Sequence, residues 1–256
     1  MKTRIIILAI FFFITIWPAF PAAKKNTIGN VDYTVGAKLS FTRIPVWLNP
    51  QTDTETKTSN TLSLSYLDIY GDVALSEYIT LGLSVGYASH SMRKTVEFNT
   101  LPLSVQLQGK TFAGVLLGVH ARSNFFSWDN FTFQSNAQVL TFMESTQNLP
   151  VTLDLAKGNA EIKHSITESS IDLLVQYEGL SSCNIYAGPQ LAWVSGDYKV
   201  NETIETLQGS QELSYKQKKL FGIIAGAHME VGNFDIKAEL SLFSRTGVGV
   251  RVYYML

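Results

Sequence analysis

The residue types that most often carry chemistry are few and widely spaced in this chain. Cys183 is the only cysteine, so the fold has no internal disulfide. His90 and Ser91 are adjacent in a segment predicted to be a strand, so their side chains point to opposite faces and cannot form a nucleophile–base pair. The histidines also lack the spacing of metal ligands: His90, His120, His164 and His228. We therefore expect no catalytic site, no metal and no cofactor.

A larger group of charged side chains shares one pattern. Each lies on the face of a predicted strand opposite the apolar side chains: Lys38, Asp172, Glu178, His228, Glu230, Asp235, Lys237, Glu239 and Arg251. If the strands close into a barrel, the first pairs with the last, which brings Lys38 and Arg251 near Lys237, Glu239 and Glu230. Charges in a low-dielectric interior must be paired. We predict a salt-bridge and hydrogen-bond network that fills the lumen, with a narrow polar conduit as the alternative.

Ten segments of alternating polarity must position these residues. Successive side chains on a strand point to opposite faces, so a period of two predicts strands rather than helices. The predicted strands are Val31–Val46, Thr61–Val73, Ile79–Met92, Lys110–Arg122, Phe131–Glu144, Glu168–Gly179, Asn184–Ser195, Lys218–Val231, Phe234–Phe243 and Gly247–Leu256. The fold class is therefore all-β, an antiparallel up-and-down barrel of ten strands, with eight as the alternative.

The connections between these strands alternate in length. Short turns include the one around Ser76 and the Gly232-Asn233 pair. Long polar links on one side and short turns on the other are typical of a transmembrane β-barrel, and an even strand number places both termini on the short-turn side. The predicted long links are Leu48–Asn60, Arg93–Gly109, Ser145–Thr167 and Gly196–Gln217.

The composition of the two strand faces favours a membrane over water. In Ile79–Tyr87, apolar residues alternate with Thr, Gly and Ser. A soluble sandwich, which is the alternative, would carry many charges on its wetted face. Small uncharged residues suit a crowded barrel interior, and several aromatics lie near strand ends, where a membrane interface places them. The segment Thr61–Val73 shifts its apolar phase after Tyr66, which predicts a β-bulge there.

The first 23 residues have the layout of an export signal. Lys2 and Arg4 precede an uncharged apolar run, Ile5–Trp17, and a segment of small residues and prolines. We expect cleavage near Ala23, with an uncleaved anchor as the alternative. The mature domain is then 24–256. Without Lys2 and Arg4 it carries 18 basic and 21 acidic residues, a balance that does not favour nucleic-acid binding.

The mature chain resembles the small outer-membrane β-barrel superfamily, which includes the opacity-type and eight- to ten-stranded barrels. The resemblance rests on the signal peptide, the paired segments Tyr66–Val73 and Ile79–Tyr87, the string at 221–227 and the terminal strand Val248–Leu256, whose last residue departs from the usual aromatic. It implies export to the outer membrane of a Gram-negative-type bacterium. It also implies contact with outer-membrane lipid and lipopolysaccharide, insertion by the barrel-assembly machinery, and a monomer.

Two enzyme families share this architecture, and neither motif is present. Omptin proteases carry paired aspartates opposite an Asp-x-His element, and lipid A deacylases carry a His-x-Ser-Asn element. The nearest strings here, around His90, His120 and His164, match neither spacing. Polar links on a rigid scaffold commonly carry recognition. We therefore expect a structural or surface-interaction role, such as adhesion or contact with host or surface ligands, and keep a narrow pore and a lipid- or peptide-directed enzyme as alternatives.

Overall fold

The computed structural model describes residues 32–50, 58–76, 78–98, 105–107, 109–153, 156–180, 183–232 and 234–255. Asp32–Leu256 forms one compact unit. The signal peptide predicted at 1–23 and residues 51–57 of the first predicted link lie outside the described residues. Within the described part, no helix is long and apolar enough to cross a membrane. The strands are β1 (Asp32–Pro50), β2 (Thr58–Ser76), β3 (Ile79–Met92), β4 (Val96–Phe98), β5 (Val105–Leu107), β6 (Thr111–Trp128), β7 (Phe131–Leu153), β8 (Ala156–Tyr177), β9 (Asn184–Ile204), β10 (Leu207–Gln217), β11 (Phe221–Val231), β12 (Phe234–Leu242) and β13 (Thr246–Met255).

The main sheet closes on itself, with every pairing antiparallel. Among the described residues, the ring of neighbours runs β1-β2-β3-β6-β7-β8-β9-β11-β12-β13 and returns to β1. Lys38 shows the closure directly, since it is the register partner of Asp68 on β2 and of Arg251 on β13. Each of the ten segments predicted from the sequence overlaps one strand of this ring. A closed ring leaves no strand edge to be satisfied by solvent.

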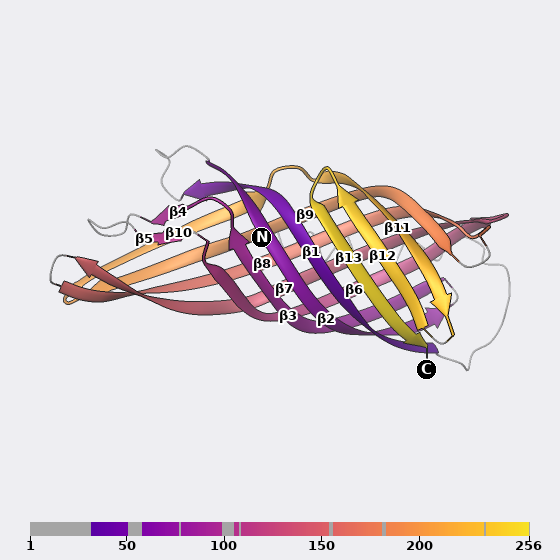
Figure 1. The fold of residues 1–256 in the computed structure, drawn as a ribbon, viewed down its shortest axis with the longest axis horizontal. Helices are drawn as coiled ribbons and strands as arrows, with labels where there is room; N and C mark the ends of the chain where they lie inside the picture. The colour runs from indigo at the N-terminus through magenta and orange to yellow at the C-terminus, as the bar shows by residue number, and fades with distance from the viewer. Residues whose placement is uncertain are drawn as a thin grey trace. The chain divides into compact units, whose positions relative to one another are not determined.

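An eleventh strand, β10, completes the sheet at one end. β9 pairs with β11 up to Leu191 and then with β10 from Ser195, while β1 leaves β13 after Arg43 and pairs with β10 from Val46. β10 therefore lies between β9 and β1, beyond the short strands β11, β12 and β13 (Figure 1).

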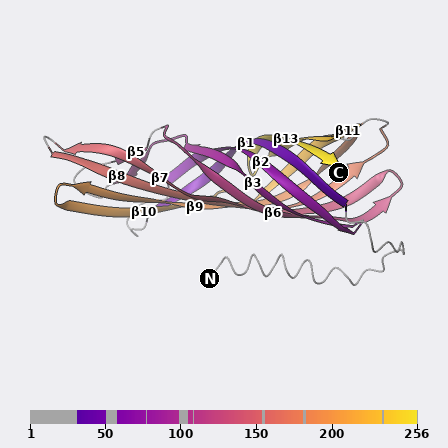
Figure 2. The same cartoon turned by 90° about the horizontal axis from the view of Figure 1, so that it is seen from below.

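Two predicted links are strands in the structure. Ser145–Thr167 forms the ends of β7 and β8, and Gly196–Gln217 forms the β9–β10 hairpin. Polar composition hid the strand alternation in the second segment, where Tyr198, Val200 and Tyr215 are buried. Both hairpins, β7–β8 and β9–β10, close at the same end of the barrel, which we call the hairpin end. The turn end carries the β2–β3, β6–β7, β8–β9 and β11–β12 turns. Figure 2 shows β7 to β10 reaching beyond the other strands.

An apolar belt covers the outer surface of the barrel between these ends. In β3 the outward residues Leu83, Val85 and Tyr87 are exposed, whereas the inward Gly82 and Ser84 are buried. The same alternation gives the belt its other exposed members: Leu39, Phe41, Leu67, Ile69, Val115, Leu117, Val119, Leu173, Val175, Leu191, Phe221, Ile223, Leu240, Val248, Val250 and Val252. The faces predicted for these strands are confirmed.

The two faces exchange character towards the hairpin end. There Lys157, Lys199 and Asn201 point outward and are exposed, while the interior is a continuous apolar cluster, which we name the upper core. The upper core includes Ile44, Val46, Leu62, Leu64, Tyr66, Phe112, Leu116, Leu140, Phe142, Ile162, Ile166, Val194, Tyr198, Val200, Leu213 and Tyr215. The small β4–β5 sheet adds Val96, Phe98 and Leu107 to it, and the Phe98 ring lies 6.3 Å from the Tyr198 ring.

This exchange explains the phase shift in β2, and the predicted β-bulge is wrong. β2 pairs with β3 residue for residue from Leu62 to Ala74, and the register shifts only between Ala74 and Ser76. Tyr66 is buried in the upper core and Leu67, the next residue, is exposed on the belt. The apolar side chains change phase because the apolar medium lies inside the barrel at one height and outside it at the other.

Candidate functional site: the barrel interior

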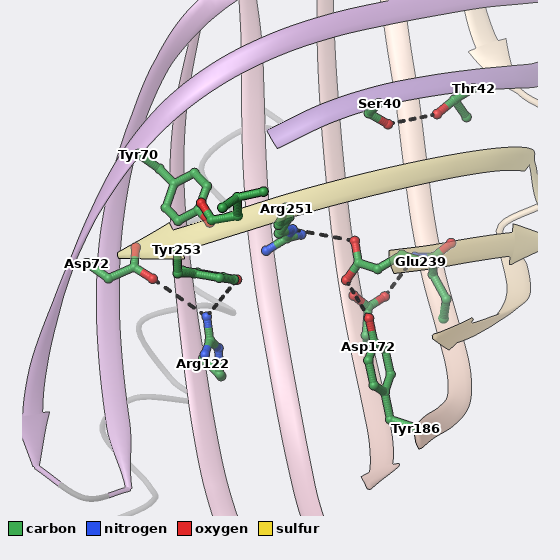
Figure 3. A network of polar contacts seen from close by, with 12 residues as sticks. Ser40, Thr42, Tyr70, Asp72, Arg122, Asp172, Tyr186, Glu239, Arg251 and Tyr253 are labelled. Carbon is green, nitrogen blue, oxygen red and sulfur yellow. Dashed lines mark hydrogen bonds and ion pairs between the residues drawn. The ribbon is translucent and has the colours of Figure 1, made fainter. Parts of the chain in front are cut away.

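The polar lumen next to the belt is organised around Arg251 and Glu239. Arg251 Nε lies 3.4 Å from Glu239 Oε2 across the β12–β13 pairing (Figure 3). Tyr186 on β9 donates its hydroxyl proton to Glu239 at 3.3 Å. Gly226 stands between them on β11, and a Cβ at that position would lie 2.4 Å from the Tyr186 hydroxyl oxygen. The glycine therefore leaves the space through which the tyrosine reaches the carboxylate.

A second group lies nearer the turn end. His120 Nε2 is 2.7 Å from Asp72, and Arg122 is 3.6 Å from the other oxygen of the same carboxylate. Arg122 also donates to the Tyr253 hydroxyl at 3.3 Å, and the Tyr70 ring packs edge-on against Tyr253 at 5.0 Å (Figure 3). One aspartate thus contacts both His120 and Arg122 beside two tyrosine rings.

A third group lies just below the upper core. Arg245, from the β12–β13 link, forms an ion pair with Glu168 on β8, and each side chain is only 7% exposed. Gln190 donates to Asp172 at 2.9 Å. The pairing of Arg245 with Glu168 joins strands on opposite arcs of the ring, because β8 and β13 are separated by β9, β11 and β12.

The structure brings most of the predicted lumen charges together, but not all. Lys38 and Asp172 are buried, Arg251 and Glu239 are paired, and Lys237 lies 5.7 Å from the centre of the Tyr253 ring. The predicted His228 also has a partner, since its Nε2 lies 2.5 Å from Asp235.

Glu178 and Glu230 differ from the prediction. Both are exposed, because they lie where β8 and β11 reach the turn end and the barrel wall no longer encloses them. Glu178 accepts a hydrogen bond from Gln176 at 3.0 Å.

Several members of the network were missed. Asp68 and Asp72 follow the inward phase of β2, a signal that the supposed bulge obscured. Arg245 falls in the short link between the last two predicted strands, where no strand alternation applies, and it is buried. The aromatic members Tyr70, Tyr186 and Tyr253 share the inward phase of their strands, so alternation alone could have found them.

Two polar cavities remain between these side chains. One has a volume of about 40 Å³ and is bordered by Lys38, Arg245 and Asp172. The second has a volume of about 10 Å³ and is bordered by Arg122, Lys237 and Tyr253. Glu239 and Arg251 line both cavities. Their ion pair therefore stands at the boundary between the two spaces.

A pair of histidines is enclosed by the upper core. His90 on β3 and His164 on β8 are each 1% exposed. The His164 Nε2 and Tyr215 Oη atoms share a hydrogen bond of 2.9 Å, and His90 stacks on Phe112 with an interplanar angle of 12°. This part of the barrel lies outside the apolar belt. Burial lowers the pKa of His90 to about 3, and it also lowers the pKa of His164 well below its ordinary value.

The described interior positions charged and polar side chains in ion pairs and hydrogen bonds. Among the described residues, no set of three or more His, Cys, Asp or Glu side chains is placed to hold a metal ion. His120 contacts Asp72, an arrangement found in general bases, and its ring lies 5.9 Å from the Tyr70 ring.

Comparison with known proteins supports the fold. No protein-family model matches the chain, and no curated protein matches it. Among solved structures, it is similar to the outer-membrane protease OmpT from Escherichia coli, with 9% identity, a TM-score of 0.51, and coverage of 91% of this chain and 99% of that one. It also matches the translocator domain of the autotransporter NalP from Neisseria meningitidis, with 11% identity, a TM-score of 0.46 and coverage of 90% of each chain.

A further match is the COG4313 outer-membrane channel from Pseudomonas putida F1, with 7% identity, a TM-score of 0.42, and coverage of 93% of this chain and 100% of that one. The closed antiparallel ring, the outward belt and the likeness to OmpT together define the fold. It is an antiparallel up-and-down β-barrel with the fold seen in outer-membrane barrels such as OmpT, and the all-β barrel predicted from the sequence is confirmed.

Proposed function

We propose that this protein is an integral outer-membrane barrel of a diderm bacterium, with a sealed lumen and a structural or surface-interaction role. The exchange of faces between the belt and the hairpin end is the observation that carries the proposal. An apolar exterior suits lipid, and a polar exterior over an apolar interior suits water. The hairpin end then projects from the cell, because outer-membrane barrels place their longer connections outside.

Two barriers in series support a sealed lumen. The upper core fills the barrel at the hairpin end with side chains such as Tyr198 and Tyr215, which are 1% and 0% exposed. Below it, the Arg251–Glu239 pair stands between the two polar cavities. An apolar constriction resists wetting, and ions cannot cross it without losing their hydration shells.

Planar-bilayer recording tests the sealed lumen. The reconstituted wild-type protein is expected to give no steady conductance. Opening the apolar constriction with Tyr198→Ala and Phe112→Ala should produce measurable current, whereas Lys199→Ala on the outer surface should not. Steady wild-type current would overturn the sealed state and favour a narrow pore.

A narrow pore is the second candidate because the polar cavities line up on both sides of Arg251 and Glu239. If ions pass, Glu239→Ala should change both the size and the cation preference of the conductance, since it removes a negative charge that lines both polar cavities. Asp197→Ala, a charge on the outer surface at the hairpin end, serves as the control.

The surface-interaction role rests on the outward faces of β8 and β9 at the hairpin end. Exposed polar residues there lie on paired strands, so they form a fixed surface rather than a mobile loop. Replacing Lys157, Asn159, Lys199 and Asn201 with serine keeps the inward core intact. Loss of adherence by cells displaying this variant, at equal surface abundance, would support recognition through this surface. Unchanged adherence would leave a structural role.

A further inference from the structure

A cluster of basic side chains lies on the outer surface where β1 meets β10. Arg43 and Trp47 project outward from β1, and Trp47 is the register partner of Lys216 on β10. The backbone of Lys218 donates to the Pro45 carbonyl, which brings the β10–β11 link against the same part of β1. We name Arg43, Lys216, Lys218 and Lys219 the basic patch.

The basic patch borders the apolar belt. Phe41 precedes Arg43 by two residues on the same face and is 50% exposed, and its register partner Val248 is also exposed. On the neighbouring link, Lys219 is followed by exposed Leu220 and Phe221. On β1 and on the β10–β11 link, the apolar surface therefore gives way to positive charge within one or two residues. In a membrane this is the level of the lipid headgroups.

Few opposing charges surround the patch. The outward register partners of Arg43 are Ser63 on β2 and Thr246 on β13. Among the described residues, Arg43, Lys216 and Lys219 have no ion pair within 4 Å. Two outward-facing acids lie nearby: Asp197 on β9, whose register partner is Ser214, and Glu212 on β10, which pairs with Lys199 at 3.9 Å.

The Lys218 side chain of the basic patch is held in place by Trp47 and Ser59. The Lys218 ammonium lies 3.7 Å from the centre of the Trp47 ring and donates to the Ser59 hydroxyl. A cation held over an indole keeps less of its conformational freedom than a solvated lysine. Tryptophan is itself favoured at the membrane interface, where its apolar ring meets lipid and its N–H meets water.

We propose that the basic patch binds the phosphate groups of a phosphorylated glycolipid of the outer leaflet. A guanidinium can grip a phosphate through two N–H donors, and ammonium groups add point charges. The acyl chains would lie along Phe41 and Phe221, because these side chains border the patch on its membrane side. The inference rests on the proposed orientation of the barrel, since the other orientation would place the patch in the inner leaflet.

Binding of rough lipopolysaccharide to the purified full-length protein in non-ionic detergent tests this assignment. The variant is Arg43→Gln, Lys216→Gln and Lys218→Gln. The matched control is Lys157→Gln, Lys163→Gln and Lys199→Gln, which removes equal charge from the outward face of β8 and β9, farther from the belt. Heat-modifiable gel mobility confirms that each protein is folded.

We expect the patch variant to bind lipopolysaccharide at least about tenfold more weakly than wild type, and the control to bind as wild type does. Dephosphorylated lipopolysaccharide should lower wild-type affinity to the level of the variant. Equal affinity of all three proteins for the phosphorylated lipid would overturn the assignment, as would full competition by inorganic phosphate at millimolar concentration.

The same proteins separate this inference from the proposed function. Reconstitution into phosphatidylcholine vesicles followed by flotation reports membrane insertion without any glycolipid. If the wild-type protein floats but shows no preference for phosphorylated lipid, glycolipid binding by the basic patch is rejected and the membrane barrel is retained. Wild-type protein that stays soluble without detergent removes the proposed function itself.

Discussion

His90 and His164 lie with their ring centroids 4.0 Å apart, although 73 residues separate them and they come from β3 and β8. The rings are tilted by 30° and are enclosed by Phe112, Phe142 and Tyr198. Neither ring nitrogen of His90 has a hydrogen-bond partner among the described residues. The pair is stable as two neutral imidazoles, since a proton on either would be a buried charge beside the other ring.

The histidine pair predicts that the hairpin end is destabilised by acid. The folded-state pKa values lie below the ordinary value of 6.5, to about 3 for His90, so the contribution is fully present above pH 6.5 and is lost as pH falls towards the folded pKa. At pH 5 the loss should approach about 2 kcal/mol for His90, and His164 should add to it in the same direction. Amide hydrogen exchange of β8 at pH 7.5 and pH 5 measures it, after correction for the intrinsic exchange rate. His90→Leu should reduce the pH dependence, and equal protection at both pH values would contradict the account.

Glu202 predicts a stabilising substitution. Its side chain is 1% exposed on the inner face of β9, and neither carboxylate oxygen has a hydrogen-bond partner within the described residues. Glu202→Leu removes an unpaired buried polar group and should raise the free energy of unfolding by about 1–3 kcal/mol. Urea unfolding in detergent, followed by tryptophan fluorescence, measures the change. Glu212→Leu, on the outward face of β10, should have no such effect, and a destabilised Glu202→Leu protein would show that the carboxylate has a partner.

Arg245 and Glu168 predict strong coupling in a double-mutant cycle. Arg245→Met leaves the Glu168 carboxylate buried without its partner and should cost about 3–5 kcal/mol. Removing both charges, with Arg245→Met and Glu168→Met, should recover most of that loss because no buried charge remains. The urea midpoint of the heat-modifiable gel shift measures each variant. Additive effects of the two single changes would mean that the pair is not coupled.

Gly188 and Gly71 predict opposite tolerance to alanine. A Cβ at Gly188 would lie 1.8 Å from the Leu173 carbonyl oxygen, which is backbone of β8 and cannot move aside as a side chain can. A Cβ at Gly71 would have no atom within 4 Å. Gly188→Ala should therefore lower the folded yield by disturbing the β8–β9 pairing, while Gly71→Ala should refold as wild type does. Folded fraction on unheated gels gives the comparison, and equal yields would refute it.

The sequence was sufficient for the ring of strands because alternation is a local property. Leu83 and Val85 against Gly82 and Ser84 already state which face is apolar. The phase change at Tyr66 and Leu67 was visible as well, but a single strand cannot say whether the backbone or the surrounding medium changes. The structure decides this through the unbroken register of β2 with β3.

The interior network was only partly predictable. The proximity of Lys38 and Arg251 could be predicted, because closing the barrel pairs the first strand with the last and places these two residues side by side. The approach of Arg245 to Glu168 and of His90 to His164 depends on how side chains cross the lumen from non-neighbouring strands. That geometry is set by the tilt and stagger of the whole barrel, which no local pattern contains.

The double partnership of β1 has a consequence for the order of assembly. β1 needs β13 along its first part and β10 along its last part, and both strands come from the final quarter of the chain. Until those residues arrive, one edge of β1 has no strand beside it. Such an edge can pair with another copy or with a chaperone. Any incomplete form of this barrel therefore exposes an unpaired, association-prone strand edge that the closed barrel lacks.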